Sequence, residues 1–106
     1  MKKRKISILG DSISTFAGYT PVEAVFYDSY VQWETGVKSV EDTWWMKVIH
    51  ALDGELGVNH SLAGSMVSGN LSTSAMSENR IAKLGDNGIP DIILVSAGCN
   101  DWGFCV

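Results

Sequence analysis

Apolar residues in this 106-residue chain fall into three short runs that predict β-strands. The first run covers residues 5–9 and ends at a Gly-Asp-Ser turn. A briefer run covers residues 55–59. The third covers residues 91–97 and is almost continuously apolar, which is typical of a strand buried on both faces of a parallel sheet.

Between the strands, apolar residues recur at spacings of three and four, which predicts helices. One helix is expected over residues 43–53, with Asp42 or Thr43 as N-cap and a glycine as its stop. A second is expected over residues 70–84, before two further glycines. Residues 13–40 lack such a period, so we expect a long, partly ordered loop packed by its own aromatic side chains.

The order strand, loop, helix, strand, helix, strand predicts an α/β fold with a parallel sheet and right-handed crossovers. The carboxyl ends of strands in such a sheet lie along one edge. Each predicted strand ends in a polar cluster that contains glycine, at residues 10–12, 64–65 and 98–101. We therefore expect these three clusters to meet at one edge of the sheet.

Composition is that of a single globular domain, with 45% hydrophobic and 19% charged residues. The longest apolar run, residues 92–95, is far shorter than the roughly 20 residues that cross a bilayer, so we expect no membrane segment. The net charge is −4, and four of the eight cations lie at residues 2–5. The rest of the chain is strongly acidic, which argues against a nucleic-acid partner.

The basic start is followed by an apolar stretch of only residues 6–9, which is too short for the core of a signal peptide. The two cysteines, Cys99 and Cys105, form no Cys-x-x-Cys pair and have no histidine cluster beside them. Free thiols in a reducing compartment are expected. The sequence therefore predicts a cytoplasmic protein without a metal site or cofactor.

Ser12 lies at the turn after the first strand, where the unpaired N–H groups of a helix start stabilise negative charge. Taken alone, a serine at this place is usually an N-cap. Asn100, at the end of another strand, is a neutral donor that can point at an oxyanion, and Gly64 offers a backbone N–H. The three together, at successive strand ends, favour a nucleophile beside an oxyanion hole.

These clusters resemble the sequence blocks of the SGNH (GDSL-type) hydrolases. The three blocks are Gly10-Asp11-Ser12-Ile13-Ser14, Gly64 after Asn59-His60-Ser61-Leu62-Ala63, and Gly98-Cys99-Asn100-Asp101. The resemblance implies a flavodoxin-like three-layer α/β/α sandwich with a parallel sheet, of which about the first three strands are present. It also implies cofactor-free hydrolysis of an acyl or acetyl ester of a carbohydrate, lipid or small molecule.

By this resemblance, Ser12 attacks the acyl carbon, and the amides of Ser12 and Gly64 with the Asn100 side chain form the oxyanion hole. The residues that support the turns are Gly10, Asp11, Gly98 and Asp101. The family takes its base from an Asp-x-x-His motif, which these 106 residues do not contain. We therefore expect residues 1–106 to be the N-terminal part of a single domain.

Two histidines remain as substitutes for that base. His50 lies in a predicted helix and is expected at the surface, whereas His60 ends the second strand and is the candidate base. A non-catalytic alternative is a pseudo-enzyme, or a module that binds a ligand or a partner in the same crevice. A nucleotide-binding protein is less favoured, because the first loop lacks a glycine-rich phosphate cradle.

The resemblance also bears on partners. In the family's sheet order, the strand at residues 92–97 has a neighbour on both sides, and the neighbour on the outer side lies beyond the three predicted strands. A bare apolar edge favours pairing with another chain. We therefore expect self-association through this strand.

Overall fold

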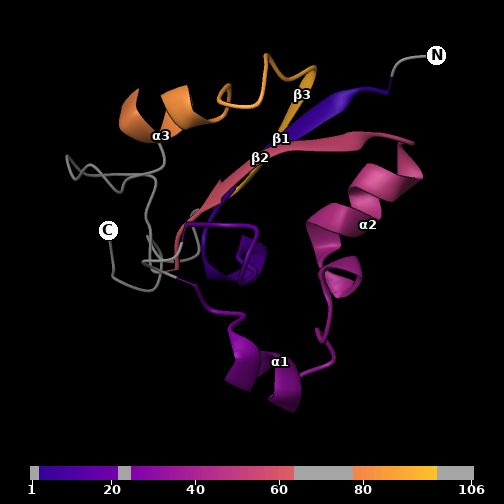
Figure 1. The fold of residues 1–106 in the computed structure, drawn as a ribbon, viewed down its shortest axis with the longest axis vertical. Helices are drawn as coiled ribbons and strands as arrows, with labels where there is room; N and C mark the ends of the chain where they lie inside the picture. The colour runs from indigo at the N-terminus through magenta and orange to yellow at the C-terminus, as the bar shows by residue number, and fades with distance from the viewer. Residues whose placement is uncertain (1–2, 22–24, 64–77, 98–106) are drawn as a thin grey trace.

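The computed structural model describes residues 3–21, 25–63 and 78–97. Its centre is a three-stranded parallel sheet in the order β2-β1-β3 (Figure 1). The strands are β1 (Lys5–Gly10), β2 (Glu55–Ser61) and β3 (Ile92–Ser96). All three strands were expected from the sequence, and β1 lies in the middle of the sheet.

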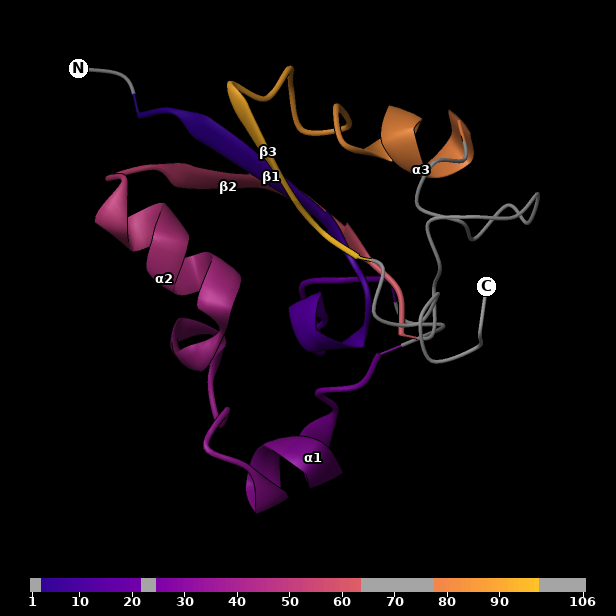
Figure 2. The same ribbon diagram turned by 180° about the vertical axis from the view of Figure 1, so that it is seen from behind.

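Helix α2 (Trp44–Ala51) covers one face of the sheet, and α3 (Glu78–Lys83) lies on the other side (Figures 1 and 2). This layering confirms the α/β class and the flavodoxin-like arrangement. Thr43 is the N-cap of α2, and its hydroxyl accepts the N–H of Met46 at 3.3 Å, as the sequence predicted. The expected helix over 70–84 is confirmed at α3, while residues 70–77 lie outside the described residues.

The main core lies between the sheet and α2. Its buried members are Ile6, Ile8, Phe16, Trp45, Met46 and Ile49. On the opposite face, the buried apolar cluster consists of Leu9 and Leu84, with Ala97 packed against them. Among the described residues, the α2 face therefore contributes most of the apolar burial that stabilises the sheet.

The expectation that β3 is buried on both faces is wrong. Ile92 and Leu94 pack against the α2-face core, but Ile93 is 47% exposed and Val95 is 63% exposed. Ile93 pairs with Ser7 and Val95 with Leu9, so both point to the α3 face. Helix α3 is short and contacts β2, which leaves this part of β3 uncovered by the described residues.

Residues 13–40 are more regular than expected. They include most of a 3-10 turn, η1 (Ser12–Ser14), a short helix, α1 (Ser29–Glu34), and the start of a second 3-10 turn, η2 (Val40–Asp42). Asp28 caps α1 by accepting the N–H of Val31 at 3.0 Å. None of the α1 residues is buried, so the helix has no apolar stripe by which the sequence would reveal it.

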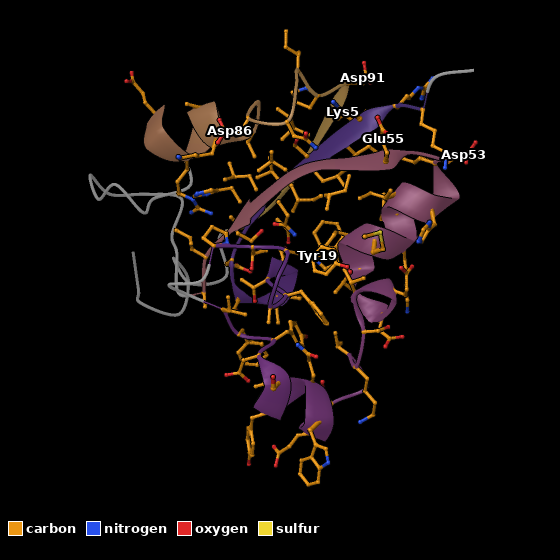
Figure 3. The ribbon with its side chains drawn as sticks, viewed as in Figure 1. Lys5, Tyr19, Asp53, Glu55, Asp86 and Asp91 are labelled. Carbon is orange, nitrogen blue, oxygen red and sulfur yellow. The ribbon has the colours of Figure 1, made fainter. Side chains whose placement is uncertain are left out.

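The aromatic residues of this segment only partly pack against one another. Phe16 is buried and meets Tyr19 edge-on, and Tyr19 lies 6.2 Å from the Trp45 ring of α2, centroid to centroid (Figure 3). Tyr30 and Trp33 are exposed, at 65% and 74%. The expected aromatic packing therefore holds for the part of the segment near α2 and not for α1.

Helix α2 ends differently from the expected glycine stop. The residue with positive φ is Asp53, at 52°, and the N–H of Gly54 then returns to the Ile49 carbonyl at 2.8 Å. Gly54 is needed for space, because a Cβ there would lie 2.7 Å from Cδ1 of Ile6. The glycine therefore lets the start of β2 approach β1 closely.

Charged residues gather at the amino ends of the strands, as Figure 3 shows for Lys5, Glu55 and Asp91. The backbone N–H of Asp91 donates to the Lys5 carbonyl there at 2.8 Å, and the Asp91 carboxylate accepts the Lys5 N–H at 2.8 Å.

The described part of the chain has no helix long and apolar enough to span a membrane.

Asp42 makes the turn before α2 sensitive to acid. Its carboxylate accepts the backbone N–H groups of Ser39 and Lys38, both at 3.1 Å, and these bonds lower the pKa of Asp42. A lowered folded-state pKa adds stability above the unfolded-state value, and this stability is lost as the pH falls through the folded-state value. We expect Asp42→Asn to reduce the rise in urea midpoint between about pH 3 and pH 5.

The matched control is Asp86→Asn, which changes an exposed aspartate after α3. It removes one exposed carboxylate of the same kind and so gives the reference profile for Asp42→Asn. Equal pH profiles for Asp42→Asn and the unmodified chain would contradict the role given to Asp42.

Candidate active site

The carboxyl ends of the three strands lie side by side. Gly10 pairs with Ser61 of β2 and with Ser96 of β3, so β1 ends level with both neighbours. Ser12 follows Gly10 closely, and the chain leaves β2 and β3 at the same edge (Figure 2). The predicted convergence of strand ends is therefore present as far as Ala63 and Ala97.

Four of the expected site residues lie outside the described residues: Gly64, Gly98, Asn100 and Asp101. The same holds for Cys99 and Cys105. Their expected roles therefore remain predictions. Ser12, Gly10, Asp11 and His60 are described, and all four lie at the carboxyl edge of the sheet.

Gly10 is needed at this edge because neighbouring atoms leave no room for a side chain. A Cβ there would lie 2.5 Å from Oγ of Ser14, 2.8 Å from its Cβ and 3.0 Å from the carbonyl oxygen of Ser96. Real Cβ atoms essentially never make contacts under 3.0 Å. The glycine lets the η1 turn fold back directly over the end of β1.

The η1 turn holds Ser12 at its first position. The Asp11 carbonyl accepts the Ser14 N–H at 3.0 Å, and the Ser12 carbonyl accepts the Thr15 N–H at 3.1 Å and its hydroxyl at 2.7 Å. Ser12 is partly exposed. Among the residues that the structure describes, its hydroxyl makes no hydrogen bond. Ser12 therefore lies at the strand ends with its hydroxyl not engaged by the described residues.

Asp11 supports the turn through its backbone and not through its side chain. It is the N-cap of η1, but its side chain makes no capping bond, and its backbone carbonyl closes the turn instead. The residue is buried, at 4% exposed. Its carboxylate is close enough to the Arg80 guanidinium to act on the pKa of that group.

A buried polar network that the sequence analysis did not identify anchors the turn from the α2 side. Ser14 is fully buried, and its hydroxyl accepts the indole N–H of Trp44 at 3.1 Å. Its carbonyl accepts a side-chain N–H of Asn59 at 2.9 Å, and Asn59 in turn accepts the Ser61 hydroxyl. These bonds join η1 to α2 and β2, so the position of Ser12 is fixed by both elements.

Strand β2 carries an extra residue that decides which way its side chains point. Ile6 pairs with Leu56, but Ile8 pairs with Asn59, so β2 gains one residue over this stretch. The freed N–H of Val58 donates to the Ser7 hydroxyl at 3.1 Å, and that hydroxyl donates to the Leu84 carbonyl at 2.9 Å. A side chain of β1 thereby accepts the N–H group that the bulge leaves without a partner in the ladder.

His60 lies beyond this bulge, beside Leu9 and on the α3 face of the sheet. Arg80 of α3 donates to it twice, from Nη2 to its carbonyl at 2.8 Å and from Nε to its ring Nδ1 at 3.3 Å. Nη2 also donates to the Gly10 carbonyl at 2.9 Å. Burial lowers the pKa of the Arg80 guanidinium, and the Asp11 carboxylate partly opposes this shift.

The sequence analysis did not single out Arg80, and no local motif marks it. It occupies one position of a predicted amphipathic helix, where a cation is ordinarily solvated. Only the fold reveals that this position faces the strand ends. The other histidine, His50, is exposed on α2 and bonds to Glu41 at 2.6 Å, as expected for a surface residue.

No group of three or more His, Cys, Asp or Glu side chains that could hold a metal ion occurs within residues 3–21, 25–63 and 78–97. The described edge contains a serine hydroxyl, an imidazole and a buried guanidinium on whose pKa the Asp11 carboxylate acts.

The close approach at Gly10 can be tested by substitution. We expect Gly10→Ala to destabilise the fold by about 1–3 kcal/mol, because the added methyl group overlaps the Ser14 side chain, which is buried and hydrogen-bonded to Trp44. Urea denaturation monitored by tryptophan fluorescence measures the change. Gly36→Ala is the control, since a Cβ at Gly36 has nothing within 4 Å. Equal losses in the two variants would refute the steric account.

Comparison with known proteins agrees with this geometry. The family model for GDSL-like lipases and acylhydrolases matches residues 4–104. A protein of Bacteroides ovatus ATCC 8483, classed as a GDSL-like lipase, superposes with a TM-score of 0.75 at 34% identity. Another such protein, from Bacteroides uniformis ATCC 8492, superposes with a TM-score of 0.64 at 36% identity. No curated protein matches the chain.

The alignments cover nearly all of this chain and about half of each relative. They include 98% of the chain and 53% of the B. ovatus protein, and 93% of the chain and 49% of the B. uniformis protein. The chain thus spans about half the length of the solved structures that it matches. The family match over almost its whole length, together with the strand-end geometry, shows that the chain belongs to the GDSL-like lipase/acylhydrolase family.

Proposed function

We propose that this chain carries the nucleophile and the oxyanion hole of a serine ester hydrolase. The observation that carries the proposal is the register of the sheet, in which Gly10 lies between Ser61 and Ser96. Because of that register, the segments that begin after these residues, including Ser12, Gly64 and Asn100, start from adjacent strand ends. Membership of an acylhydrolase family supports a hydrolase function in general.

In the proposed mechanism, the Ser12 Oγ attacks the acyl carbon of an ester, and its proton passes to a base. The carbonyl oxygen becomes an oxyanion, which accepts hydrogen bonds from the amides of Ser12 and Gly64 and from the Asn100 side chain. The alcohol then leaves with a proton, and the acyl group stays on Ser12. Water releases the acid and restores the hydroxyl. The proposed substrate is an acyl or acetyl ester of a carbohydrate, a lipid or a small molecule.

The base is the part of the mechanism that these residues do not supply in the family's form. An Asp-x-x-His motif is absent from the 106 residues, and the related structures are about twice as long as this chain. We therefore propose that residues 1–106 correspond to the N-terminal part of one domain, and that the base comes from outside them. A non-catalytic ligand-binding module is the alternative that the missing motif keeps open.

The esterase proposal is tested by hydrolysis of p-nitrophenyl acetate. With solvent or buffer accepting the proton in place of the missing base, we expect Ser12→Ala to lower the rate at least about tenfold, because it removes the attacking oxygen. Ser29→Ala is the matched control, since Ser29 is an exposed serine on α1, and it should keep the rate of the unmodified chain. Release of nitrophenolate, followed by absorbance, is the measurement.

Equal rates for the unmodified chain and for Ser12→Ala would exclude esterase activity of this chain. Binding of the same acyl compounds without turnover would then favour the ligand-binding alternative.

We also propose that the chain self-associates through the outer edge of β3. Within the described residues, β3 pairs with β1 on one side and with no strand on the other. Its exposed apolar side chains, Ile93 and Val95, lie along this strand, and such an edge favours pairing with a second copy.

Light scattering over a range of concentrations measures this association. We expect the mass of the unmodified chain to rise toward that of a dimer, and Val95→Lys to stay monomeric because a charge blunts the edge. Ile89→Lys is the control, since Ile89 is 91% exposed but precedes the strand. A monomeric mass for the unmodified chain at every concentration would disprove the association.

A further inference from the structure

Arg80 is a buried charge that the proposed chemistry does not use. It is 1% exposed and lies on α3, on the opposite side of the sheet from the main core. Its Nη2 donates to two backbone carbonyls, those of Gly10 at 2.9 Å and His60 at 2.8 Å. These carbonyls belong to neighbouring strands, so one guanidinium joins the carboxyl ends of β1 and β2.

A further bond of Arg80 involves a ring nitrogen. Arg80 Nε lies 3.3 Å from Nδ1 of His60. A guanidinium has five N–H donors and no acceptor, so Nδ1 must accept this bond with its lone pair. The ring hydrogen of neutral His60 is then on Nε2. The bulge in β2 makes the contact possible, because it places His60 on the α3 face beside Leu9.

The Arg80 guanidinium also interacts with a carboxylate. Asp11, 4% exposed, is the described carboxylate that acts on Arg80, and it directly precedes Ser12. A buried guanidinium requires such a partner as well as hydrogen bonds for its donors. Arg80 therefore interacts with the residues on both sides of the Gly10–Asp11 peptide, from which the η1 turn begins.

We propose that Arg80 is a positioning residue for Ser12 and His60. It fixes the Gly10 carbonyl, and hence the start of the Ser12 turn, against β2, and it holds the His60 ring with its hydrogen on Nε2. The assignment deepens the proposed function and rests on it for the role of Ser12. It also means that Nδ1 of His60 is not the base that accepts the Ser12 proton.

The first test measures the His60 ring itself, without any reaction. The 15N chemical shifts of the ring are recorded at mildly alkaline pH, above the range in which an imidazole is ordinarily protonated, and exposed His50 serves as internal reference. We expect Nδ1 of His60 to be unprotonated in the unmodified chain. In Arg80→Lys, which keeps the charge beside Asp11 but loses the planar set of donors, we expect a mixture of tautomers.

Controls separate positioning from folding. Lys83→Gln changes an exposed cation on the same helix and should leave the His60 signals unchanged. The amide signals of Ile6, Ile8 and Ile49 report on the α2-face core and should be the same in all variants. If Arg80→Lys does not fold by this criterion, Arg80→Gln is measured in its place.

The second test follows the reaction of Ser12 with a fluorophosphonate, in which the Ser12 Oγ–P bond forms, fluoride leaves and solvent accepts the hydroxyl proton. We expect Arg80→Lys to slow this reaction on the order of tenfold or more, because small displacements of a reacting group carry costs of that size. Lys83→Gln should react at the rate of the unmodified chain.

The outcomes distinguish the two proposals. Unchanged His60 tautomers in folded Arg80 variants would overturn the positioning role, whatever the reactivity of Ser12. An unmodified chain that does not react with the fluorophosphonate would instead count against the proposed esterase, while the His60 spectra would still decide the role of Arg80.

Discussion

Strand β1 is hydrogen-bonded on both sides, and the other described elements are arranged around this double pairing. Because β1 runs parallel to both neighbours and ends level with them at Gly10, the segments that follow all three strands start from one short stretch of the sheet edge. The same strand supplies Ile6 and Ile8 to one core and Leu9 to the other. Loss of either pairing would separate the strand ends as well as open the core.

The two faces of the sheet stabilise the carboxyl ends of the strands through different interactions. On the α2 face, a large apolar core is completed by the buried bonds of Ser14 to Trp44 and Asn59. On the α3 face, the apolar cluster is small, and hydrogen bonds from Arg80 and Ser7 contribute more to connecting the α3 region with β1. Apolar packing tolerates small shifts, whereas hydrogen bonds to fixed carbonyls depend on direction. Directional hydrogen bonds on both faces therefore fix the strand ends, and the α3 face depends on them more than the α2 face does.

The sequence predicted the features that rest on local pattern. The three strands and α2 follow from runs and spacings of apolar residues, and the Thr43 cap follows from its hydroxyl just before the helix. Helix α1 was missed because it buries nothing and so has no apolar stripe. The exposure of Ile93 and Val95 was missed because an apolar run does not reveal how far the covering helix extends.

The described residues of the site also divide into those that a local sequence signal predicts and those that it does not. Ser12 was found because its turn is marked by neighbouring residues, and Arg80 was not, because its partners are distant in sequence and are brought together only by the fold. The bulge in β2 has no distinct signature in its residues, although it decides which face His60 occupies.

That bulge changes which residues of β2 share a face. Side chains alternate between the faces of a regular strand, so residues three apart, such as Leu56 and Asn59, would lie on opposite faces. The extra residue brings Leu56 beside Ile6 and Asn59 beside Ile8, on the same face of the sheet. Straightening β2 without shortening it would turn every side chain beyond the bulge to the opposite face, so that Asn59 would leave Ser14 and His60 would leave Arg80. Removing one residue of the bulge would instead keep both contacts, so the strand can lose its bulge only together with one residue.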